Sequence, residues 1–385
     1  KETLQEIRSE FLYWYPYDFR FSAKDLISNH LTFQLFHHKA IFPEEFQPQG
    51  MVVFGMGLLN GAKMSSSKGN VVLLEDAISE FGADTVRMFL VGSAEPWQDF
   101  DWRNELVSSV RKQIDRFWNT IQEGIASGRG GEYSPIDAWF LSRLQSRIEK
   151  TTAALRMFQT RQALQEAYFG IETDLKWYRR RTAGVRGSGA MMPDLCSVWV
   201  RLLAPFIPYT SEKLWQDMGG EGMVVYAAWP DPDVAMINPG IELEEELLSR
   251  TVEDIESILK LIQMKPKAIN LYVAPAWKWQ VFRTLALCSD RSMGIREVMK
   301  DESMRGRGKE ATAASKQITT FIHRLPPTIV EQLAGQEIDE KNLFEKAREF
   351  LEREFSVPIR VMTAEEGDHA KAESALPFKP AIVIE

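Results

Sequence analysis

A long stretch of helical periodicity begins near Trp102 and constrains the fold more than any other feature of this sequence. Apolar side chains recur there at steps of three and four residues, which places them on one stripe of an amphipathic helix. The stripe consists of Trp102, Leu106, Val110, Ile114, Phe117, Trp118 and Ile121. Further helices are predicted at about 135–158, 160–181 and 193–217. Four antiparallel helices with short connections predict a helical bundle over residues 102–245.

Local signals mark where two of these helices start or break. Ser134 is a good N-cap residue, and Pro135 suits the first helical position because its missing N–H would be unpaired there anyway. Pro205 and Pro208 remove backbone donors and should kink or divide the fourth helix.

The first 101 residues have the pattern of an α/β segment. An aromatic run from Phe11 to Ala23 predicts a strand and a turn, and residues 25–42 then show helical spacing. Residues 50–55 predict a short buried strand. Two short helices follow, with Gly82 as the stop between them and Asp84 as an N-cap.

Residues 246–385 predict a separate small α/β unit. A helix at about 243–264 leads into it, and strands are expected near 268–274, near 358–364 and at the C-terminal end. A helix is expected at 342–355. At 385 residues, the chain is long enough for two or three domains.

Composition excludes several classes of protein. The formal net charge of −8 argues against a chain that coats nucleic acid non-specifically, although a local basic face is still possible. No apolar run approaches the roughly 18 residues that a membrane helix needs. Cys196 and Cys288 lie far apart, and we predict that both are buried free thiols in a reducing cytosol, not a disulfide or a metal site. We therefore expect a cytoplasmic protein without membrane, DNA or resident metal.

The stretch NGAKMSSSKGN at residues 60–70 raises the question of phosphate chemistry. A flexible surface loop is one interpretation, because Ser, Gly and Lys are common in loops. A P-loop is excluded by spacing, since only Ala62 separates Gly61 from Lys63 and Met64 stands where the metal-binding hydroxyl should be. A mobile loop that closes lysine ammonium groups on a polyphosphate is the third interpretation.

Two segments carry a family resemblance that favours the third interpretation. Lys63-Met64-Ser65-Ser66-Ser67 resembles the lysine signature loop of class I aminoacyl-tRNA synthetases. The block YWYPYDFRFSAKDLISNHLTF at residues 13–33 resembles leucyl-tRNA synthetases of the archaeal and eukaryotic type. Residues 195–215 and the C-terminal ALPFKPAIVIE are similar to the same family, so the resemblance covers essentially the whole chain.

The resemblance implies a fold in three parts. Residues 1–101 would form the α/β C-terminal half of a Rossmann-type catalytic domain, with the lysine loop and a stem-contact region. Residues 102–245 would form an α-helical bundle of the anticodon-binding type. Residues 246–385 would form a small tRNA-binding α/β domain.

The resemblance also implies an ATP site. The catalytic loop would close on the β and γ phosphates of ATP and comprises Lys63, Met64, Ser65, Ser66, Ser67 and Lys68. The family usually has a second lysine where this chain has Ser66, so Lys68 would replace it or Lys63 would act alone.

The nucleoside half of that site would be formed by Ala23, Asp25, His30, Gly55 and Met56. Asp25 would bind the ribose, or alternatively cap a helix, and Ala23 replaces the usual glycine. His30 would line the aminoacyl-adenylate pocket, although a lone helical histidine is more often a core residue, and His37 and His38 are interpreted as structural. The strand end at Gly55 and Met56 would receive adenine, with a tight turn as the alternative for Gly55.

The densest basic cluster, KWYRRR at residues 176–181, predicts contact with tRNA phosphates. Its cations are Lys176, Arg179, Arg180 and Arg181. The alternative is a solvated helix C-terminus, where cations complement the helix dipole. The family further implies that deletion after about residue 265 weakens tRNA binding and leaves the ATP site intact.

One expected signature is missing. Class I synthetases carry a His-x-Gly-His motif that faces the same phosphates, and none of the five histidines here belongs to one. The chain also starts at Lys1, so we expect a fragment or one subunit of a split enzyme, with the N-terminal half as its partner. The implied function is ATP-dependent activation of leucine, with ATP and Mg²⁺ as substrate, and its transfer to tRNA(Leu). The alternatives are a tRNA-binding module that does not catalyse, or a methionyl or lysyl enzyme.

Overall fold

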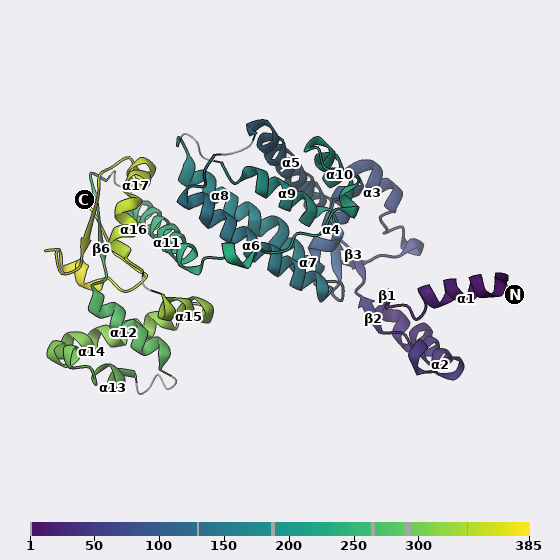
Figure 1. Ribbon diagram of the computed structural model, residues 1–385, viewed down its shortest axis with the longest axis horizontal. Helices are drawn as coiled ribbons and strands as arrows, with labels where there is room; N and C mark the ends of the chain where they lie inside the picture. Colours follow the sequence, from purple (N-terminus) through teal and green to yellow (C-terminus); the bar gives the residue numbers. More distant parts are fainter. Residues whose placement is uncertain (1, 129–130, 186–188, 263–265, 289–293, 337) are drawn as a thin grey trace. The chain divides into compact units, whose positions relative to one another are not determined.

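The computed structural model describes residues 2–128, 131–185, 189–262, 266–288, 294–336 and 338–385. These residues form two compact units (Figure 1). The first unit comprises Lys1–Tyr178 and Gly184–Val234, and the second comprises Arg179–Ala183 and Ala235–Glu385. The predicted division into three domains with boundaries at 101 and 245 stays a prediction.

The first unit starts with a helix where the sequence predicted a strand. Helix α1 (Glu2–Trp14) includes the first part of the aromatic run, and only Phe19–Ala23 forms strand β1. The prediction was wrong for Phe11–Trp14 because the run from Glu2 has no glycine or proline and is rich in good helix formers. The helix ends shortly before Pro16, as the steric demands of proline require.

A small parallel sheet follows. Strand β2 (Gly50–Phe54) pairs with β1, with Phe19 opposite Gly50 and Ala23 opposite Phe54. Between the two strands lie a 3₁₀ turn, a π-helical turn (Ile27–Leu31) and helix α2 (Thr32–Ile41). The strand predicted at 50–55 is confirmed as β2, but its predicted burial was wrong, since β2 is only half-buried and the Phe54 side chain is exposed. Among the described residues this sheet has only two strands.

A second sheet and two short helices complete the α/β part. Its strands, in the order β4-β3-β5, are β3 (Gly57–Leu59), β4 (Ala62–Lys63) and β5 (Phe100–Trp102). Helices α3 (Leu74–Phe81) and α4 (Ala83–Ser93) meet at Gly82, whose φ of +86° favours glycine. The predicted stop at Gly82 is confirmed.

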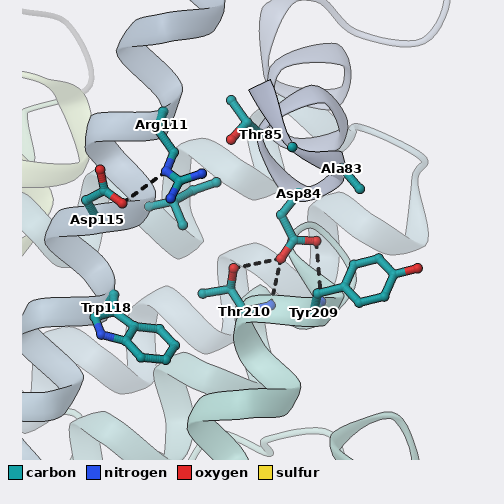
Figure 2. Close-up of a pocket in the computed structure, with 10 residues that line it drawn as sticks. Ala83, Asp84, Thr85, Arg111, Asp115, Trp118, Tyr209 and Thr210 are labelled. Carbon is teal, nitrogen blue, oxygen red and sulfur yellow. Dashed lines mark hydrogen bonds and ion pairs between the residues drawn. The ribbon is translucent and has the colours of Figure 1, made fainter. Parts of the chain in front are cut away.

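Asp84 caps a different helix from the one predicted (Figure 2). Its buried carboxylate accepts hydrogen bonds from the backbone N–H groups of Tyr209 and Thr210 at 3.3 and 2.6 Å, and from the Thr210 hydroxyl at 2.7 Å. These N–H groups lie in the first turn of helix α10 (Pro208–Asp217), where they have no partner within the helix. Asp84 therefore fastens α4 to α10 instead of capping α4.

A series of helices then forms most of the first unit (Figure 1). They are α5 (Asn104–Ser127), α6 (Pro135–Arg156), α7 (Thr160–Leu164), α8 (Ile171–Thr182), α9 (Met192–Leu203) and α10. The residues of α8 from Arg179 onwards belong to the second unit. Ser134 caps α6 through a capping box with Asp137, and the segment after Leu203 divides the fourth predicted helix into α9 and α10, so both predictions are confirmed.

The bundle core follows the predicted stripe with one shift. Phe117 and Ile121 of α5 are fully buried, and the Phe117 ring meets Trp199 edge-on with 4.9 Å between centroids. Leu106 is half exposed, however, and Val107 is buried in its place. The stripe therefore drifts around α5 by one residue at its N-terminal end.

The second unit is an α/β unit around a three-stranded sheet (Figure 1). Strand β6 (Ile269–Val273) is buried and lies between β7 (Ile359–Thr363), which is parallel to it, and β8 (Ala381–Ile384), which is antiparallel. Its helices are α11 (Pro239–Ile262), α12 (Ala276–Leu287), α13 (Gly294–Val298), α14 (Glu302–Ile322), α15 (Pro327–Gly335), α16 (Glu340–Lys346) and α17 (Arg348–Phe355). The three strands are confirmed, and the helix predicted at 342–355 is broken at Ala347.

Neither cysteine is in a disulfide, as predicted, but only Cys196 is buried. Cys288 is half-buried because it lies just after the end of α12. The described residues contain no group of His, Cys, Asp and Glu side chains that could hold a metal ion. In the same part of the chain, no helix combines the length and apolar character that crossing a membrane requires.

Candidate functional site

The loop singled out in the sequence starts as a tight β-hairpin. Asn60 and Gly61 both have left-handed backbone angles, with φ of +52° and +78°, which is the pattern of a two-residue type I′ turn. The turn joins β3 to β4 and places Lys63 opposite Leu58. We call residues 57–63 the lysine hairpin; its Lys63 side chain is exposed.

The serines that follow form a closed turn. The Ser65 N–H donates to the Asn70 carbonyl at 3.2 Å, the Lys68 N–H donates to the Ser65 carbonyl at 3.1 Å, and the two hydroxyls of Ser65 and Ser67 lie 2.9 Å apart. Gly69 takes a φ of +66°. Lys68 is exposed and Met64 is half-buried, whereas the side chain of Ser66 lies outside what the structure describes. Two exposed lysines therefore flank a compact turn.

Asp25 and His30 lie just beyond the end of β1. Ala23 is the last residue of that strand, and Asp25 sits in the 3₁₀ turn that follows. Ala23 occupies the N-cap position of this turn, so Asp25 is not its N-cap. His30 is exposed, with Nε2 2.9 Å from Nη2 of Arg20, so a core role does not describe it.

The two histidines of α2, His37 and His38, differ from each other. The His38 ring stacks on Tyr15 with 5.8 Å between centroids, and its Nδ1 lies 2.7 Å from the Gln34 carbonyl oxygen. His38 thus has the structural role predicted for it. His37 is exposed.

The strand end at Gly55 and Met56 packs closely against the segment that leads into β5. The Gly55 N–H donates to the Pro96 carbonyl at 2.8 Å, and the Met56 N–H donates to the Asp99 carboxylate at 2.7 Å. A Cβ on Gly55 would lie 2.1 Å from the Gln98 carbonyl oxygen. Glycine is therefore required here by a close backbone approach, and not by a positive φ.

Two aspartates on the β5 segment, which the sequence analysis did not single out, bind this region together. Asp99 accepts from Lys24 Nζ at 2.6 Å as well as from Met56. Asp101 accepts from the Gly61 N–H at 2.8 Å and from Arg103 Nε at 2.8 Å. Hydrogen bonds from Lys24 and Met56 lower the pKa of Asp99, and those from Gly61 and Arg103 lower the pKa of Asp101, so both groups are anionic at neutral pH. The alternation Asp-Phe-Asp-Trp was the available signal, because it puts two carboxylates on one face of a short strand.

The basic cluster at residues 176–181 lies on α8, across the division between the two units. Lys176 is exposed on α8 in the first unit. In the second unit, Arg180 Nη2 lies 2.6 Å from Glu256 Oε1 and 2.7 Å from Glu354 Oε1. Its neighbour Arg181 pairs with Glu245 at 3.0 Å. These two guanidinium groups already have carboxylate partners.

The geometry suits a substrate that carries phosphate groups and a sugar with free hydroxyls. Exposed ammonium groups at Lys63 and Lys68 could meet phosphates, and a carboxylate at Asp25 could accept from sugar hydroxyls. The β5 segment joins Lys24, next to Asp25, to the strand end and the hairpin. The sequence analysis predicted groups that would face a substrate, and it did not single out the two aspartates that bind the same region.

Two family models match the chain in separate stretches. Residues 6–122 match the model described as tRNA synthetases class I (M), and residues 137–272 match the anticodon-binding domain of tRNA ligase. The chain therefore carries a segment of the class I synthetase type followed by one of the anticodon-binding type. This agrees with the coarse order of the predicted fold.

Curated relatives match along the whole chain. The leucine–tRNA ligase of Methanothermobacter thermautotrophicus is 42% identical over 100% of this chain and 42% of its own length. Those of Pyrococcus abyssi and Pyrococcus furiosus are 41% and 42% identical over 100% of this chain, which covers 39% of each of them. The predicted resemblance is confirmed, and the chain spans about two fifths of the length of these relatives.

Proposed function

We propose that this chain, similar from end to end to archaeal leucine–tRNA ligases, is the C-terminal portion of such an enzyme. The enzyme would activate leucine with ATP and transfer the leucyl group to tRNA(Leu). One observation carries the proposal: similarity to these ligases extends over 100% of a chain that carries the lysine hairpin and Asp25. A chain that only bound RNA would gain nothing from keeping these groups.

The exposed lysines suit the phosphate chemistry of the first step. The leucine carboxylate attacks the α-phosphorus of ATP, the bond to the β-phosphate oxygen breaks, and pyrophosphate leaves. Negative charge grows on the β and γ phosphates, so ammonium groups that approach only in the transition state accelerate the step. Lys63 and Lys68 would supply them, and Mg²⁺ bound to ATP would add charge. Ser65 and Ser67 would shape the turn, and Met64, half-buried, would anchor it.

The nucleoside would bind at the two strand ends. Asp25 would accept hydrogen bonds from the ribose hydroxyls beside Ala23, and the adenine would lie against Gly55 and Met56. Because both of their N–H groups already donate within the chain, the adenine amino group would donate to a backbone carbonyl there. His30 would face the leucyl-adenylate.

A second segment would complete the catalytic fold. Parallel sheets are normally covered on both faces, yet Phe19 and Phe21 of β1 are 44% and 48% exposed and Phe54 of β2 is 38% exposed. The His-x-Gly-His signature is not in this sequence. Both observations support an N-terminal half as the partner that covers this sheet and supplies the opposing phosphate contacts.

The tRNA would contact the helical part and the second unit. Lys176 is an exposed cation on α8, and Arg179 lies one turn further along the same helix. Arg180 and Arg181 would reach phosphates only by exchanging their carboxylate partners. Deletion after residue 265 should weaken tRNA binding, which a filter-binding assay with tRNA(Leu) measures.

Pyrophosphate exchange tests the proposal directly. The chain is assayed with leucine, ATP and labelled pyrophosphate, alone and together with a candidate N-terminal half. We expect leucine-dependent exchange only in the combination. Exchange by the chain alone would refute the inference that its ATP site is incomplete. Binding of tRNA without exchange in the combination would instead identify a module that does not catalyse.

Methionine activation is the second candidate, because residues 6–122 match the class I (M) family model. The same exchange assay distinguishes the two when leucine and methionine are compared at equal concentration. The similarity of the whole chain to leucine enzymes predicts exchange with leucine and none with methionine. The reverse result would replace leucine by methionine as the substrate.

A further inference from the structure

We infer that Asp99 and Asp101 are positioning residues of the ATP site: they fix the lysine hairpin and the adenine-binding strand end relative to each other. The inference rests on the proposed function for its chemistry and on hydrogen-bond geometry for its mechanism. Neither aspartate would touch the substrate.

The two carboxylates hold β3 at both ends. Strand β5 pairs in parallel with β3, with Leu58 opposite Asp101. Asp99 accepts the N–H of Met56, the residue just before β3, at 2.7 Å, and Asp101 accepts the N–H of Gly61, just after it, at 2.8 Å. A strand fixed at both ends cannot slide or tilt independently of β5.

The position of Lys63 depends on this fixation. The hairpin turn at Asn60 and Gly61 sets the register between β3 and β4, and Lys63 is the last residue of β4. The Asn60 N–H adds a bond to the Trp102 carbonyl at 3.2 Å next to the Asp101 contact. Asp101 and Trp102 of β5 therefore both bind the hairpin turn, and Ser67 and Lys68 beyond Lys63 are exposed.

The position of the nucleoside site depends on Asp99. Its carboxylate also accepts from Lys24 Nζ at 2.6 Å, and Lys24 adjoins Asp25. One side chain thus joins the ribose-binding turn to the Met56 strand end. Correct spacing between the ribose, the adenine and the phosphate lysines is a requirement of catalysis, because small displacements of reacting groups reduce rates strongly.

The face of β5 opposite the two aspartates also contacts β3. Side chains alternate, so Phe100 points away from the two aspartates, and its ring would lie 2.8 Å from a Cβ on Gly57. The end of the Phe100 ring therefore packs against the glycine at the start of β3. The carboxylates on one face and the ring on the other hold β3 against β5.

Four variants test the inference in the chain combined with its N-terminal half. Asp101→Ala removes the acceptor of Gly61, whereas Asp101→Asn keeps an oxygen for that N–H and loses only the charge that pairs with Arg103. Asp99→Ala removes both the Met56 and the Lys24 contacts. Asp115→Ala is the matched control, because it breaks an exposed aspartate–arginine pair on α5 at 3.1 Å.

We expect Asp101→Ala to change the kinetic constants for ATP and to leave the KM for leucine nearly unchanged. Loss of a hydrogen bond to a charged group predicts that Asp101→Ala lowers kcat/KM for ATP in leucine-dependent exchange by about 10- to 100-fold. The KM for leucine should change by less than about twofold, because leucine does not depend on the hairpin. Asp101→Asn should recover most of the loss, and Asp115→Ala should match the unmodified chain. A role in overall folding alone would lower the amount of active enzyme without raising the KM for ATP.

Hydrogen–deuterium exchange on the chain alone gives a readout that does not need activity. A peptide over residues 57–64 should exchange faster in Asp101→Ala than in the unmodified chain, and at an unchanged rate in Asp115→Ala. Unchanged exchange at this peptide, or an unchanged KM for ATP in an active Asp101→Ala enzyme, would overturn the inference. Absence of activity in the unmodified combination would refute the proposed function, and the peptide data would still decide whether Asp101 holds the hairpin.

Discussion

Glu340 offers the sharpest test of the electrostatics in the second unit. Its side chain is buried at the start of α16, where one oxygen accepts the Phe378 N–H at 2.6 Å and the other accepts the Ala274 N–H at 3.2 Å. Burial raises the pKa of Glu340 to about 8, against the opposing effect of these two donors. The carboxyl thus links the end of β6 to the chain reversal before β8.

The sign of the pH dependence follows from the raised pKa. The folded state holds the Glu340 proton more tightly than the unfolded state, so this group stabilises the fold at low pH and loses that contribution as pH rises towards 8. A shift from 4.5 to about 8 predicts a loss of about 4 kcal/mol in the free energy of unfolding between pH 5 and pH 9. Glu340→Gln cannot ionise and should lack this loss.

Denaturant unfolding at a series of pH values measures the difference. The unmodified chain, Glu340→Gln and the control Glu349→Gln, whose side chain is exposed in the same unit, are compared by tryptophan fluorescence and far-UV circular dichroism. Glutamine has one side-chain oxygen, so one of the two backbone N–H groups, of Phe378 or Ala274, would face its NH₂ group, which cannot accept a hydrogen bond. Glu340→Gln should therefore be less stable than the unmodified chain at pH 5. This difference in the free energy of unfolding between Glu340→Gln and the unmodified chain should narrow or reverse by pH 9. Parallel pH profiles for the unmodified chain and Glu340→Gln would refute the reasoning.

Four further substitutions test individual residues. Asp84→Ala leaves the first turn of α10 without its acceptor and should lower the free energy of unfolding by about 2 kcal/mol, measured by urea denaturation. Gly55→Ala places a Cβ 2.1 Å from the Gln98 carbonyl oxygen, so leucine-dependent exchange should fall by at least about tenfold, and unaltered exchange would contradict the close approach. Arg181→Ala removes the partner of Glu245 and should reduce stability by about 1–3 kcal/mol. Lys176→Ala should reduce only the affinity for tRNA in a filter-binding assay; equal losses of affinity in both variants would contradict this distinction.

Local patterns predicted most of the elements but not every boundary. Ser134 and Pro135 act on residues within the same turn of α6, and Gly82 acts on its own backbone, so their effects can be seen in the sequence. The helix α1 was missed because aromatic residues also favour strands, and the decision depended on the polar run before them. The half-burial of β2 depends on which strands lie beside it, which no local pattern specifies.

Local sequence patterns also do not predict the partners of charged side chains. A carboxylate is bound by whichever donors the fold brings to it: Asp84 caps a helix that starts 124 positions later, and Asp101 binds a turn 40 positions earlier. For the same reason a dense basic run does not identify its partner. Arg181 has Glu245 beside it, 64 positions along the chain.

A comparison of cations then separates two kinds of basic residue. Arg180 and Arg181 are partly buried and paired, and releasing them for an RNA phosphate would leave Glu245 and Glu354 without that compensation. Among the described residues, Lys63, Lys68 and Lys176 are exposed and lie in no ion pair with a carboxylate. A phosphate can approach these lysines at no such cost. The exposed lysines are therefore better candidates for phosphate contacts than the arginines in the densest basic stretch.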